Sequence, residues 1–399
     1  MSAHFNQSPS DLPVPDADAR AHSDRLRARI FDEITSAGGA ITFERYMELA
    51  LYAPGLGYYS AGAQKFGEAG DFITAPEASP LFSRIVARQW IEILAATGGD
   101  TVLELGAGSG ALAAAALAEM AARDALPARY WILETSAELR ARQQAQLEQA
   151  LPADVFARVA WLDSLPEAPF RGVIFGNEVL DALPVARFAV TDNGLQEQGV
   201  ARDGDELVWR AVAPRDALRE AVSAVEKERG APFPPDYESE INLNLPPFVQ
   251  GLADCLESGA LLLIDYGLPR SAFYLDERAA GTLMCHYRHR AHGDPFLFPG
   301  LQDITAHVDF TAVAEAGAAA DLDVTGYTTQ AFFLLGGGLE EALRESDAEA
   351  TRAHLELTRQ VKMLTSPADM GERFKAIVLS RGLDAPPSGF ALRDLLHQL

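Results

Sequence analysis

The sequence predicts an α/β fold built on a doubly wound, mainly parallel sheet. From residue 101 onward, short apolar segments that suit buried strands alternate with segments of helical pattern. Such alternation produces right-handed βαβ units around a buried parallel sheet. The first of these strands also runs into a glycine-rich turn, Gly106–Gly110, which opens a helix. Doubly wound folds bind their ligands at turns of this kind. The two observations together predict one α/β domain over residues 99–399.

Seven segments are predicted as strands of this sheet, because they are short and mostly apolar. They are Thr101–Leu105, Tyr130–Leu133, Ala157–Leu162, Gly172–Gly176, Ala260–Ile264, Leu322–Tyr327 and Lys375–Ser380. The main helices predicted between and after them are Ala111–Ala122, Ser136–Ala150, Thr305–Ala318 and Glu340–Lys362.

The N-terminal part is predicted as a tail followed by a helical and loop cap. Residues 1–23 are rich in Pro, Ser and Asp, a composition that favours a disordered tail. Residues 24–98 combine three helical patterns with two aromatic, Gly-rich loops, at 52–59 and 70–77. Loops of this kind before a core either pack on the surface or cover a site.

The segment between the fourth and fifth strands, residues 185–258, is too long for one crossover and is predicted as an α+β insertion. Residues 187–212 alternate like antiparallel strands, with hairpin-turn signals at Asn193-Gly194 and Asp203-Gly204-Asp205. Two helical patterns follow. After the fifth strand, residues 269–302 show little periodicity, which is typical of a functional loop.

Composition and charge exclude several classes of protein. The 399 residues are 48% hydrophobic and 23% charged, which is an ordinary globular balance. The net charge of −24 disfavours nucleic acid as a partner, and solubility explains it more simply than a basic substrate does. The longest apolar run, Ala111–Ala118, has eight residues, whereas a membrane-spanning helix needs about 18. No membrane span is therefore expected.

Metal sites and export signals are not expected either. Cys255 and Cys285 are too few for a disulfide framework or a thiolate metal site. Four of the eight histidines lie within residues 286–307, but their spacing is not a closed zinc pattern, and histidines of a substrate loop are the better interpretation. The first 19 residues lack both basic residues and an apolar run, so we expect neither a secretory signal nor a transit peptide. A reducing, cytoplasmic location is the expectation.

The glycine turn follows an acid, Glu104, at the end of a strand that we expect to be buried. A pyrophosphate bound at the turn would be repelled by this carboxylate, whereas a ligand with an ammonium or sulfonium group would be attracted. Two alternatives remain. Glu104 could cap loop amides, and Gly106-x-Gly108-x-x-Ala111 also satisfies the looser dinucleotide fingerprint. We favour a cationic cofactor, because a buried carboxylate without a function is costly.

Polar residues end the next strands as well. Glu134 ends the second strand, where an acid can accept both hydroxyls of a ribose. Asp163-Ser164 ends the third, where an acid can accept the adenine amino group, although a turn role is equally plausible. With Glu104, these acids form one constellation at successive strand ends, which is a stronger signal than any single match.

A second polar group follows the fourth strand, where Asn177 and Glu178 come directly after apolar residues. Such groups could accept hydrogen bonds from a nitrogen nucleophile and orient its lone pair, whereas the alternative is helix capping by Asn177. Asp265 repeats this arrangement after the fifth strand.

The glycine turn and its acid resemble motif I of class I S-adenosylmethionine-dependent methyltransferases, and five further segments resemble the MidA-like family. The five segments are Tyr52–Tyr59, Gly70–Glu77, Asn177–Ala182, Gln302–Phe310 and Met370–Lys375. The resemblance runs from about Ile41 to Gly382. It implies a Rossmann-like, seven-stranded methyltransferase sheet with S-adenosylmethionine as cofactor. Mitochondrial members of this family act as protein arginine methyltransferases in the assembly of respiratory complex I.

The resemblance also implies roles for single residues. The methionine part of the cofactor would be held by Glu104, Gly106, Gly108 and Gly110, the ribose by Glu134, and the adenine edge by Asp163 with Ser164. A loop with Gly70, Thr74 and Glu77 would close over the site, and Asn177 would lie beside the cofactor. Glu178 would orient an incoming guanidinium, because two fixed N–H donors match a carboxylate. Further candidates around the acceptor are Asp265, Asp303 and His307.

The resemblance implies a protein as substrate, and a subunit of respiratory complex I as a candidate. Two other classes stay open. A non-catalytic assembly factor that binds S-adenosylmethionine would carry the same motifs, and an NAD-dependent oxidoreductase could use the same sheet. Glu104 argues against the oxidoreductase. The oligomeric state does not follow from the sequence.

Overall fold

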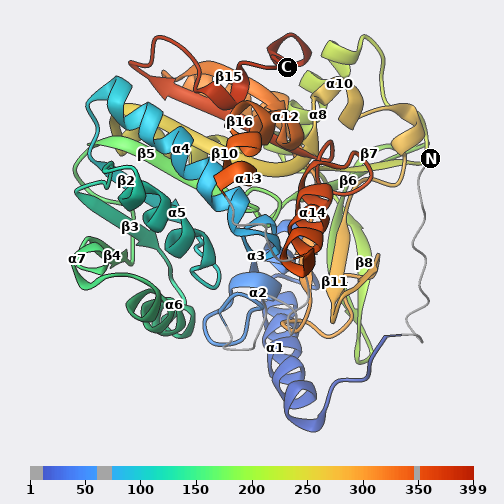
Figure 1. Cartoon of the computed structure of the whole chain (residues 1–399). Coiled ribbons are helices and arrows are strands. Elements are labelled where there is room, and N and C mark those ends of the chain that lie inside the picture. Colours follow the sequence, from blue (N-terminus) through green and yellow to red (C-terminus); the bar gives the residue numbers. More distant parts are fainter. Residues whose placement is uncertain (1–11, 61–73, 346–350) are drawn as a thin grey trace. The chain divides into compact units, whose positions relative to one another are not determined.

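The computed structural model describes residues 12–60, 74–345 and 351–399, which form two compact units (Figure 1). The first, here called the sheet unit, contains the described residues of 73–180, 246–270 and 308–399. The second, here called the meander unit, contains those of 1–72, 181–245 and 271–307. Each unit is described by itself.

The sheet unit is organised around one mixed sheet, and the predicted α/β fold is confirmed. The strand order is β15-β16-β10-β5-β2-β3-β4, with β14 pairing on β10. The strands are β2 (Thr101–Leu105), β3 (Arg129–Leu133), β4 (Val159–Leu162), β5 (Phe170–Asn177), β10 (Leu256–Leu268), β14 (Val308–Asp309), β15 (Asp323–Thr329) and β16 (Phe374–Arg381). All pairs from β4 across to β10 are parallel, whereas β16 runs antiparallel to both of its neighbours. The sheet has one short strand, β14, beyond the seven segments that we predicted.

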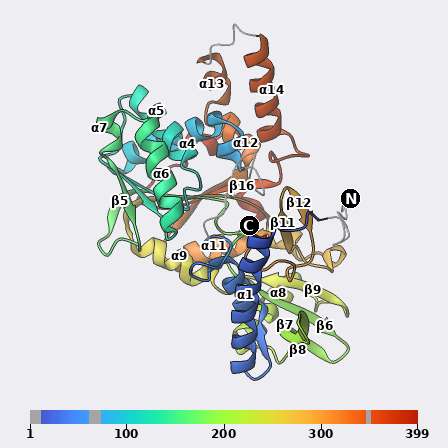
Figure 2. The same cartoon turned by 90° about the horizontal axis from the view of Figure 1, so that it is seen from below.

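Helices cover both faces of this sheet (Figures 1 and 2). Those of the sheet unit are α3 (Ala75–Ala78), α4 (Pro80–Thr97), α5 (Ala111–Ala122), α6 (Ala137–Ala150), α7 (Ala153–Phe156), α9 (Leu245–Asp254), α11 (Phe310–Ala319), α12 (Gln330–Gly336), α13 (Leu339–Glu345) and α14 (Thr351–Thr365), with short 3₁₀ turns at Ser388–Phe390 and Leu396–Gln398. Figure 2 shows α4, α5 and α6 on one face and α9 and α11 on the other. Because strand side chains alternate between faces, each strand contributes to both cores.

The core under α4 is built on aromatic contacts with the sheet. Trp90 of α4 is fully buried, and its ring lies edge-on to Phe175 of β5 at a centroid distance of 5.2 Å. The ring of Tyr130 on β3 lies 6.1 Å from the same tryptophan. These contacts hold α4 against the middle of the sheet, so that the strand ends next to it keep a defined position.

Buried charges join α4, α5 and α13. Glu119 of α5 accepts hydrogen bonds from Arg84 and Arg88 of α4 at 2.7 and 2.8 Å, and from Arg123 at 2.7 Å. All three arginines also bond Glu345 at the end of α13. Burial raises the pKa of Glu119, but the three guanidinium bonds outweigh burial and lower it to about 2.

The meander unit contains two antiparallel sheets. One has the order β1-β7-β6-β9, with β8 also pairing on β7, and the other the order β12-β11-β13. The strands are β1 (Ala40–Thr42), β6 (Ala186–Thr191), β7 (Gly194–Asp203), β8 (Glu206–Val212), β9 (Tyr237–Ile241), β11 (Met284–Tyr287), β12 (Arg290–His292) and β13 (Asp303–Thr305). Its helices are α1 (Ala17–Ser36), α2 (Phe43–Tyr52) and α8 (Asp216–Arg229), with a 3₁₀ turn at Asp276–Arg278, and α10 (Arg270–Phe273) begins at the boundary between the units.

The structure differs from the sequence predictions at several boundaries. Helix α1 begins at Ala17, inside the predicted tail, because the side chain of Asp16 accepts a hydrogen bond from the backbone N–H of Ala19 and caps it. Residues 1–11 of that tail lie outside the described residues. The predicted cap, residues 24–98, is divided, since α4 belongs to the sheet unit. The fifth strand begins at Leu256, within the predicted insertion.

The structure also differs from the predictions in the aperiodic segment 269–302 and in the last long helix. Residues 269–302 contain β11 and β12, which were not recognisable because both strands are very short. The predicted helix Glu340–Lys362 is two helices, α13 and α14, with residues 346–350 between them outside the described part. Within the described ranges, no helix has both the length and the apolar character needed to cross a membrane.

Replacement of Glu119 by Gln should destabilise the sheet unit by about 3 kcal/mol at pH 7, because three arginines lose a buried partner. The folded pKa of about 2 lies below the ordinary 4.5, so the stabilisation is present above pH 4.5 and is lost as the pH falls towards 2. Thermal denaturation at pH 7 and at pH 3 measures both effects. The matched control is Glu138→Gln, an exposed partner of Arg142. An equal loss in both variants would contradict the prediction.

Candidate functional site

The predicted site residues are distributed over both units. The sheet unit holds Thr74, Glu77, Glu104, Gly106, Gly108, Gly110, Glu134, Asp163, Ser164, Asn177, Glu178 and Asp265. The meander unit holds Asp303 and His307. Gly70 lies outside the described residues.

The turn between β2 and α5 has the backbone conformation that the glycines predict. Gly106, Gly108 and Gly110 have φ angles of +60°, +55° and +91°, a region that other L-residues avoid. A Cβ atom at Gly106 would meet no other atom within 4 Å, so the space beside this backbone is open. Such an accessible backbone at the carboxyl end of a parallel strand lets a ligand approach closely.

Glu104 lies buried beneath this turn, with only 3% of its surface exposed. Its Oε2 accepts a hydrogen bond of 2.6 Å from the hydroxyl of Tyr130 on the neighbouring strand. Burial raises the pKa of Glu104 to about 7, with a further increase from Glu134, although the bond from Tyr130 opposes the shift. A nearby cation would stabilise the ionised form, so the residue fits a ligand that carries an ammonium or sulfonium group.

Glu134 follows β3 and is held by a residue that the sequence analysis missed, Gln143 of α6. The Nε2 of Gln143 donates to Oε2 of Glu134 at 3.1 Å and to the carbonyl oxygen of Gly108 at 3.0 Å. Its Oε1 accepts from Nε1 of Trp161 at 2.9 Å. Gln143 therefore ties the glycine turn to the ends of β3 and β4. The available signal was a glutamine midway between Leu139 and Leu147, on the buried stripe of the helix.

The short helix α3 reaches the same turn. The hydroxyl of Ser109 donates a hydrogen bond to Oε1 of Glu77. Thr74 occupies the N-cap position of α3 but makes no side-chain cap bond. Both predicted residues of this loop thus lie in a segment that contacts the glycine turn.

Asp163 and Ser164 are exposed, and the Asp163 side chain is 87% accessible. Its Oδ1 pairs with Nη2 of Arg140 at 2.5 Å, and the same nitrogen donates to the carbonyl oxygens of Glu134 and Leu162. Arg140 thereby joins the ends of β3 and β4. The ion pair with Arg140 decides neither the turn role nor the adenine contact of Asp163, and both stay predictions.

Asn177 and Glu178 lie at the end of β5, and no helix follows them, so the capping alternative for Asn177 is wrong. Glu178 has a φ of +53°, which is costly for a residue with a side chain. Its N–H donates to the carbonyl oxygen of Ile264, and its Oε1 accepts from Nδ2 of Asn177 at 2.9 Å. The Oδ1 of Asn177 is buried and accepts no hydrogen bond from any described residue.

Asp265 fixes this unusual backbone. Its Oδ2 accepts hydrogen bonds from the N–H groups of Val179 and Leu180 at 3.1 and 2.9 Å, and its Oδ1 accepts from Tyr266 at 2.9 Å. The carboxylate is buried, so these bonds hold the segment after Glu178 firmly. The contacts favour a positioning role over the direct contact with the acceptor that the resemblance implied.

In the meander unit, Asp303 is buried in β13 and its Oδ1 accepts a hydrogen bond of 2.9 Å from the hydroxyl of Tyr59. The ring of Tyr59 stacks on Tyr52 at a centroid distance of 5.5 Å. His307 follows β13, and its backbone N–H donates to the hydroxyl of Thr282. Both tyrosines belong to the aromatic loop 52–59, but the sequence analysis did not name them as site residues.

The histidines within residues 286–307 belong to no metal-binding cluster of the described residues. Burial lowers the pKa of His286 to about 4, and that of His292 is lowered as well, so both are neutral at pH 7. Among the residues that the structure describes, no group of three or more His, Cys, Asp or Glu side chains could hold a metal ion.

The raised pKa of Glu104 predicts pH-dependent binding of the implied cofactor. Between pH 8 and pH 6 the ionised fraction of a group with a pKa near 7 falls about tenfold, so affinity for S-adenosylmethionine should fall by a similar factor. Glu104→Gln should bind more weakly at pH 8 and lack this dependence. Calorimetric titration of the wild type and the variant at each pH tests this prediction. The ratio of their two affinities is the quantity to compare, because the protonation of the ligand affects both affinities equally. A ratio that does not change with pH would contradict it.

Comparison with known proteins agrees with this geometry. A family model described as "Putative S-adenosyl-L-methionine-dependent methyltransferase" matches residues 85–328, more than half of the chain. A relative from Danio rerio named "Protein arginine methyltransferase NDUFAF7, mitochondrial" is 30% identical, over 85% of this chain and 83% of its own. The homologue from Drosophila melanogaster is 29% identical, over 94% of this chain and 90% of its own.

A solved structure extends the comparison to the fold and the ligand. It is the crystal structure of a COG1565 superfamily member from Burkholderia thailandensis bound to S-adenosyl-homocysteine. That chain is 46% identical and superposes with a TM-score of 0.93, over 98% of this chain and 100% of its own. The buried Glu104 and the open backbone at Gly106 fit the same class of ligand. The chain therefore uses S-adenosylmethionine as its cofactor and belongs to the Methyltransf_28 family of S-adenosylmethionine-dependent methyltransferases.

Proposed function

We propose that this protein transfers the methyl group of S-adenosylmethionine to an arginine side chain of a partner protein. The observation that supports this most directly is the pair of acceptors after β5. Glu178 offers a carboxylate, and the buried Oδ1 of Asn177 accepts no hydrogen bond from the described residues. A guanidinium presents its donors in a rigid, planar fork, so it spans two adjacent acceptors better than a compact ammonium or a hydroxyl group does.

The position of this pair supports the same proposal. Strands β2 and β5 are parallel neighbours, so the end of β5 lies on the edge of the sheet that carries the glycine turn. S-adenosylmethionine supplies an electrophilic methyl group on its sulfonium. Glu178 would fix two N–H groups of the guanidinium, and Asn177 would accept a further one. Positioning of this kind raises the rate without a covalent intermediate.

The relatives support arginine as the acceptor, because those from Danio rerio and Drosophila melanogaster are named protein arginine methyltransferases. We further propose that the partner is a subunit of respiratory complex I, as the family resemblance implies.

For location we propose the cytoplasm, and the two cysteines support a reducing compartment because both are free and buried. The relatives' names place those proteins in mitochondria. Fractionation of source cells with an antibody to the chain tests the location, and recovery in a membrane-bound organelle would refute it.

Wild-type protein should methylate arginine in purified complex I subunits, and Glu178→Gln should lower the rate at least about a hundredfold, because the charged acceptor is lost. Mass spectrometry of digested subunits measures the product, and calorimetry should show retained cofactor binding. Glu138→Gln, an exposed residue of α6, is the matched control. Cofactor binding without any methylated protein would instead indicate a non-catalytic assembly factor.

Asp265→Asn should reduce kcat by about a hundredfold and change the KM for S-adenosylmethionine much less, because the segment after Glu178 loses its anchor. An amide offers one oxygen where the carboxylate offers two, and it places a donor against a backbone N–H. Steady-state kinetics of the wild type and the variant measure the split between kcat and KM. A rise in KM with kcat unchanged would contradict a positioning role.

A further inference from the structure

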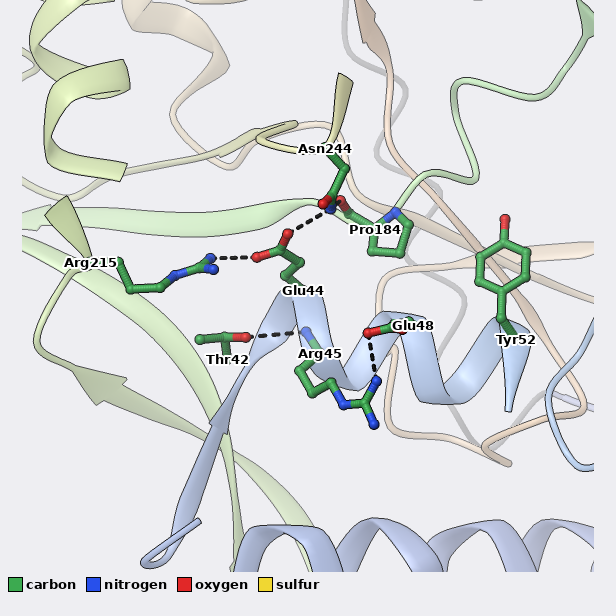
Figure 3. A pocket seen from close by; sticks show the side chains of 8 residues that line it. All are labelled: Thr42, Glu44, Arg45, Glu48, Tyr52, Pro184, Arg215 and Asn244. Atoms are coloured by element: carbon green, nitrogen blue, oxygen red, sulfur yellow. Dashed lines mark hydrogen bonds and ion pairs between the residues drawn. The ribbon is translucent and has the colours of Figure 1, made fainter. Parts of the chain in front are cut away.

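The meander unit contains a polar hollow that the proposed function does not use. Its volume is about 520 Å³, and it runs along one side of α2 (Figure 3). The lining residues are Thr42, Glu44, Arg45, Glu48, Tyr52, Pro184, Arg215 and Asn244. Glu44, Glu48 and Tyr52 recur every four residues, so two carboxylates and one aromatic ring share a helix face.

The inner wall of the hollow is fixed by hydrogen bonds. Glu44 accepts from Nη2 of Arg215 at 2.5 Å and from Nδ2 of Asn244 at 2.6 Å (Figure 3). Asn244 also donates to the carbonyl oxygen of Pro184 at 2.9 Å, and Arg215 bonds the buried Glu197. Because the guanidinium of Arg215 is already paired with two acids, an anion entering here would have to compete with both.

Glu48 is placed differently, on the open rim. Its side chain is 52% exposed and pairs with Nη1 of Arg45 at 2.6 Å. Arg45 also bonds Glu33 through Nε at 2.5 Å, so it keeps a carboxylate partner when Glu48 turns away. Exposed ion pairs contribute about 1 kcal/mol or less. A cation from another molecule can therefore replace Arg45 at Glu48 at small cost.

Tyr52 carries an aromatic surface at the end of this helix face and is 37% exposed. Its hydroxyl donates to the carbonyl oxygen of Ala182, and its ring stacks on Tyr59. A cation over the face of an aromatic ring is attracted by the ring's quadrupole, so the exposed part of Tyr52 can attract a guanidinium.

We propose that this hollow docks a basic segment of the protein substrate, with one arginine side chain on the exposed face of Tyr52 and within reach of Glu48. The proposal rests on the proposed function, since it takes the substrate to be a protein that contains arginine. It adds a binding site on the meander unit, formed by residues other than the acceptor pair of Asn177 and Glu178. The stacked ring and the rim carboxylate together select a flat, charged guanidinium.

The test uses the full chain without cofactor and a fluorescein-labelled peptide of sequence Gly-Arg-Gly-Arg-Gly, with its citrulline counterpart as the uncharged probe. Fluorescence anisotropy should show binding of the arginine peptide and at least fivefold weaker binding of the citrulline peptide. Tyr52→Leu and Glu48→Gln should each weaken binding of the arginine peptide about three- to fivefold. Tyr52→Phe keeps the ring and should bind as the wild type does.

Asp24→Asn is the matched control, because Asp24 is a half-exposed acid of α1 paired with Arg27 three residues away, as Glu48 is paired with Arg45. It should leave peptide binding unchanged. Equal affinity for both peptides, absence of binding, or a loss in Asp24→Asn as large as in Glu48→Gln would each overturn the docking site.

The two proposals fail separately in this design. Methylation of arginine in complex I subunits, with peptide binding indifferent to Tyr52→Leu and Glu48→Gln, would overturn the docking site and leave the proposed function standing. Peptide binding that depends on both residues, without methylation of any arginine, would support the docking site and overturn the proposed function. Because the side chain of Glu48 is exposed, we expect Glu48→Gln to fold normally. The docking site can therefore be tested with Glu48→Gln even if Tyr52→Leu does not fold.

Discussion

The parallel pairing of β2 with β3 and β5 is the constraint on which the cofactor site depends. Parallel strands end on the same edge of a sheet, so the residues that follow them gather there without further contacts. Glu104, Glu134 and Asn177 are far apart in sequence, but each lies at or just beyond the carboxyl end of one of these strands. The antiparallel strand β16 lies beyond β10, so it does not come between the parallel strands whose ends carry these residues.

Polar groups buried at this edge are costly, and the fold offsets the cost with hydrogen bonds between neighbouring strands and helices. Gln143 illustrates this, because a single amide bonds the glycine turn, Glu134 and Trp161. Asp265 acts in the same way for the segment after Glu178, whose left-handed backbone conformation would otherwise be unfavourable. For Glu104 the offset is partial, since its carboxylate accepts a bond from Tyr130 but burial still raises its pKa to about 7. This residual cost is what a cationic ligand relieves.

In the meander unit, the contacts around the aromatic residues join segments that are far apart in sequence, because three separate parts of the chain form this unit. Tyr52 and Tyr59 come from the N-terminal part, Ala182 from the segment after β5, and Asp303 from β13. The hydroxyl of Tyr59 and the carboxylate of Asp303 are 244 residues apart in sequence. An aromatic pair next to buried carboxylates therefore arises from contacts that no local pattern describes.

The sequence by itself determined the α/β class, seven of the eight strands of the main sheet, the glycine turn and the acids at the strand ends. Each of these is a local pattern: an apolar run, a glycine where φ is positive, or an acid directly after a strand. It also located α2, whose cap residue Thr42 accepts a bond from the N–H of Arg45. Only the tertiary structure decided the partners of Gln143, the anchoring role of Asp265 and the pairing of Tyr59 with Asp303. These contacts join segments that are distant in sequence. Hydrophobic packing of whole helices and strands determines which of those segments meet, and the local sequence around each residue does not indicate its partner.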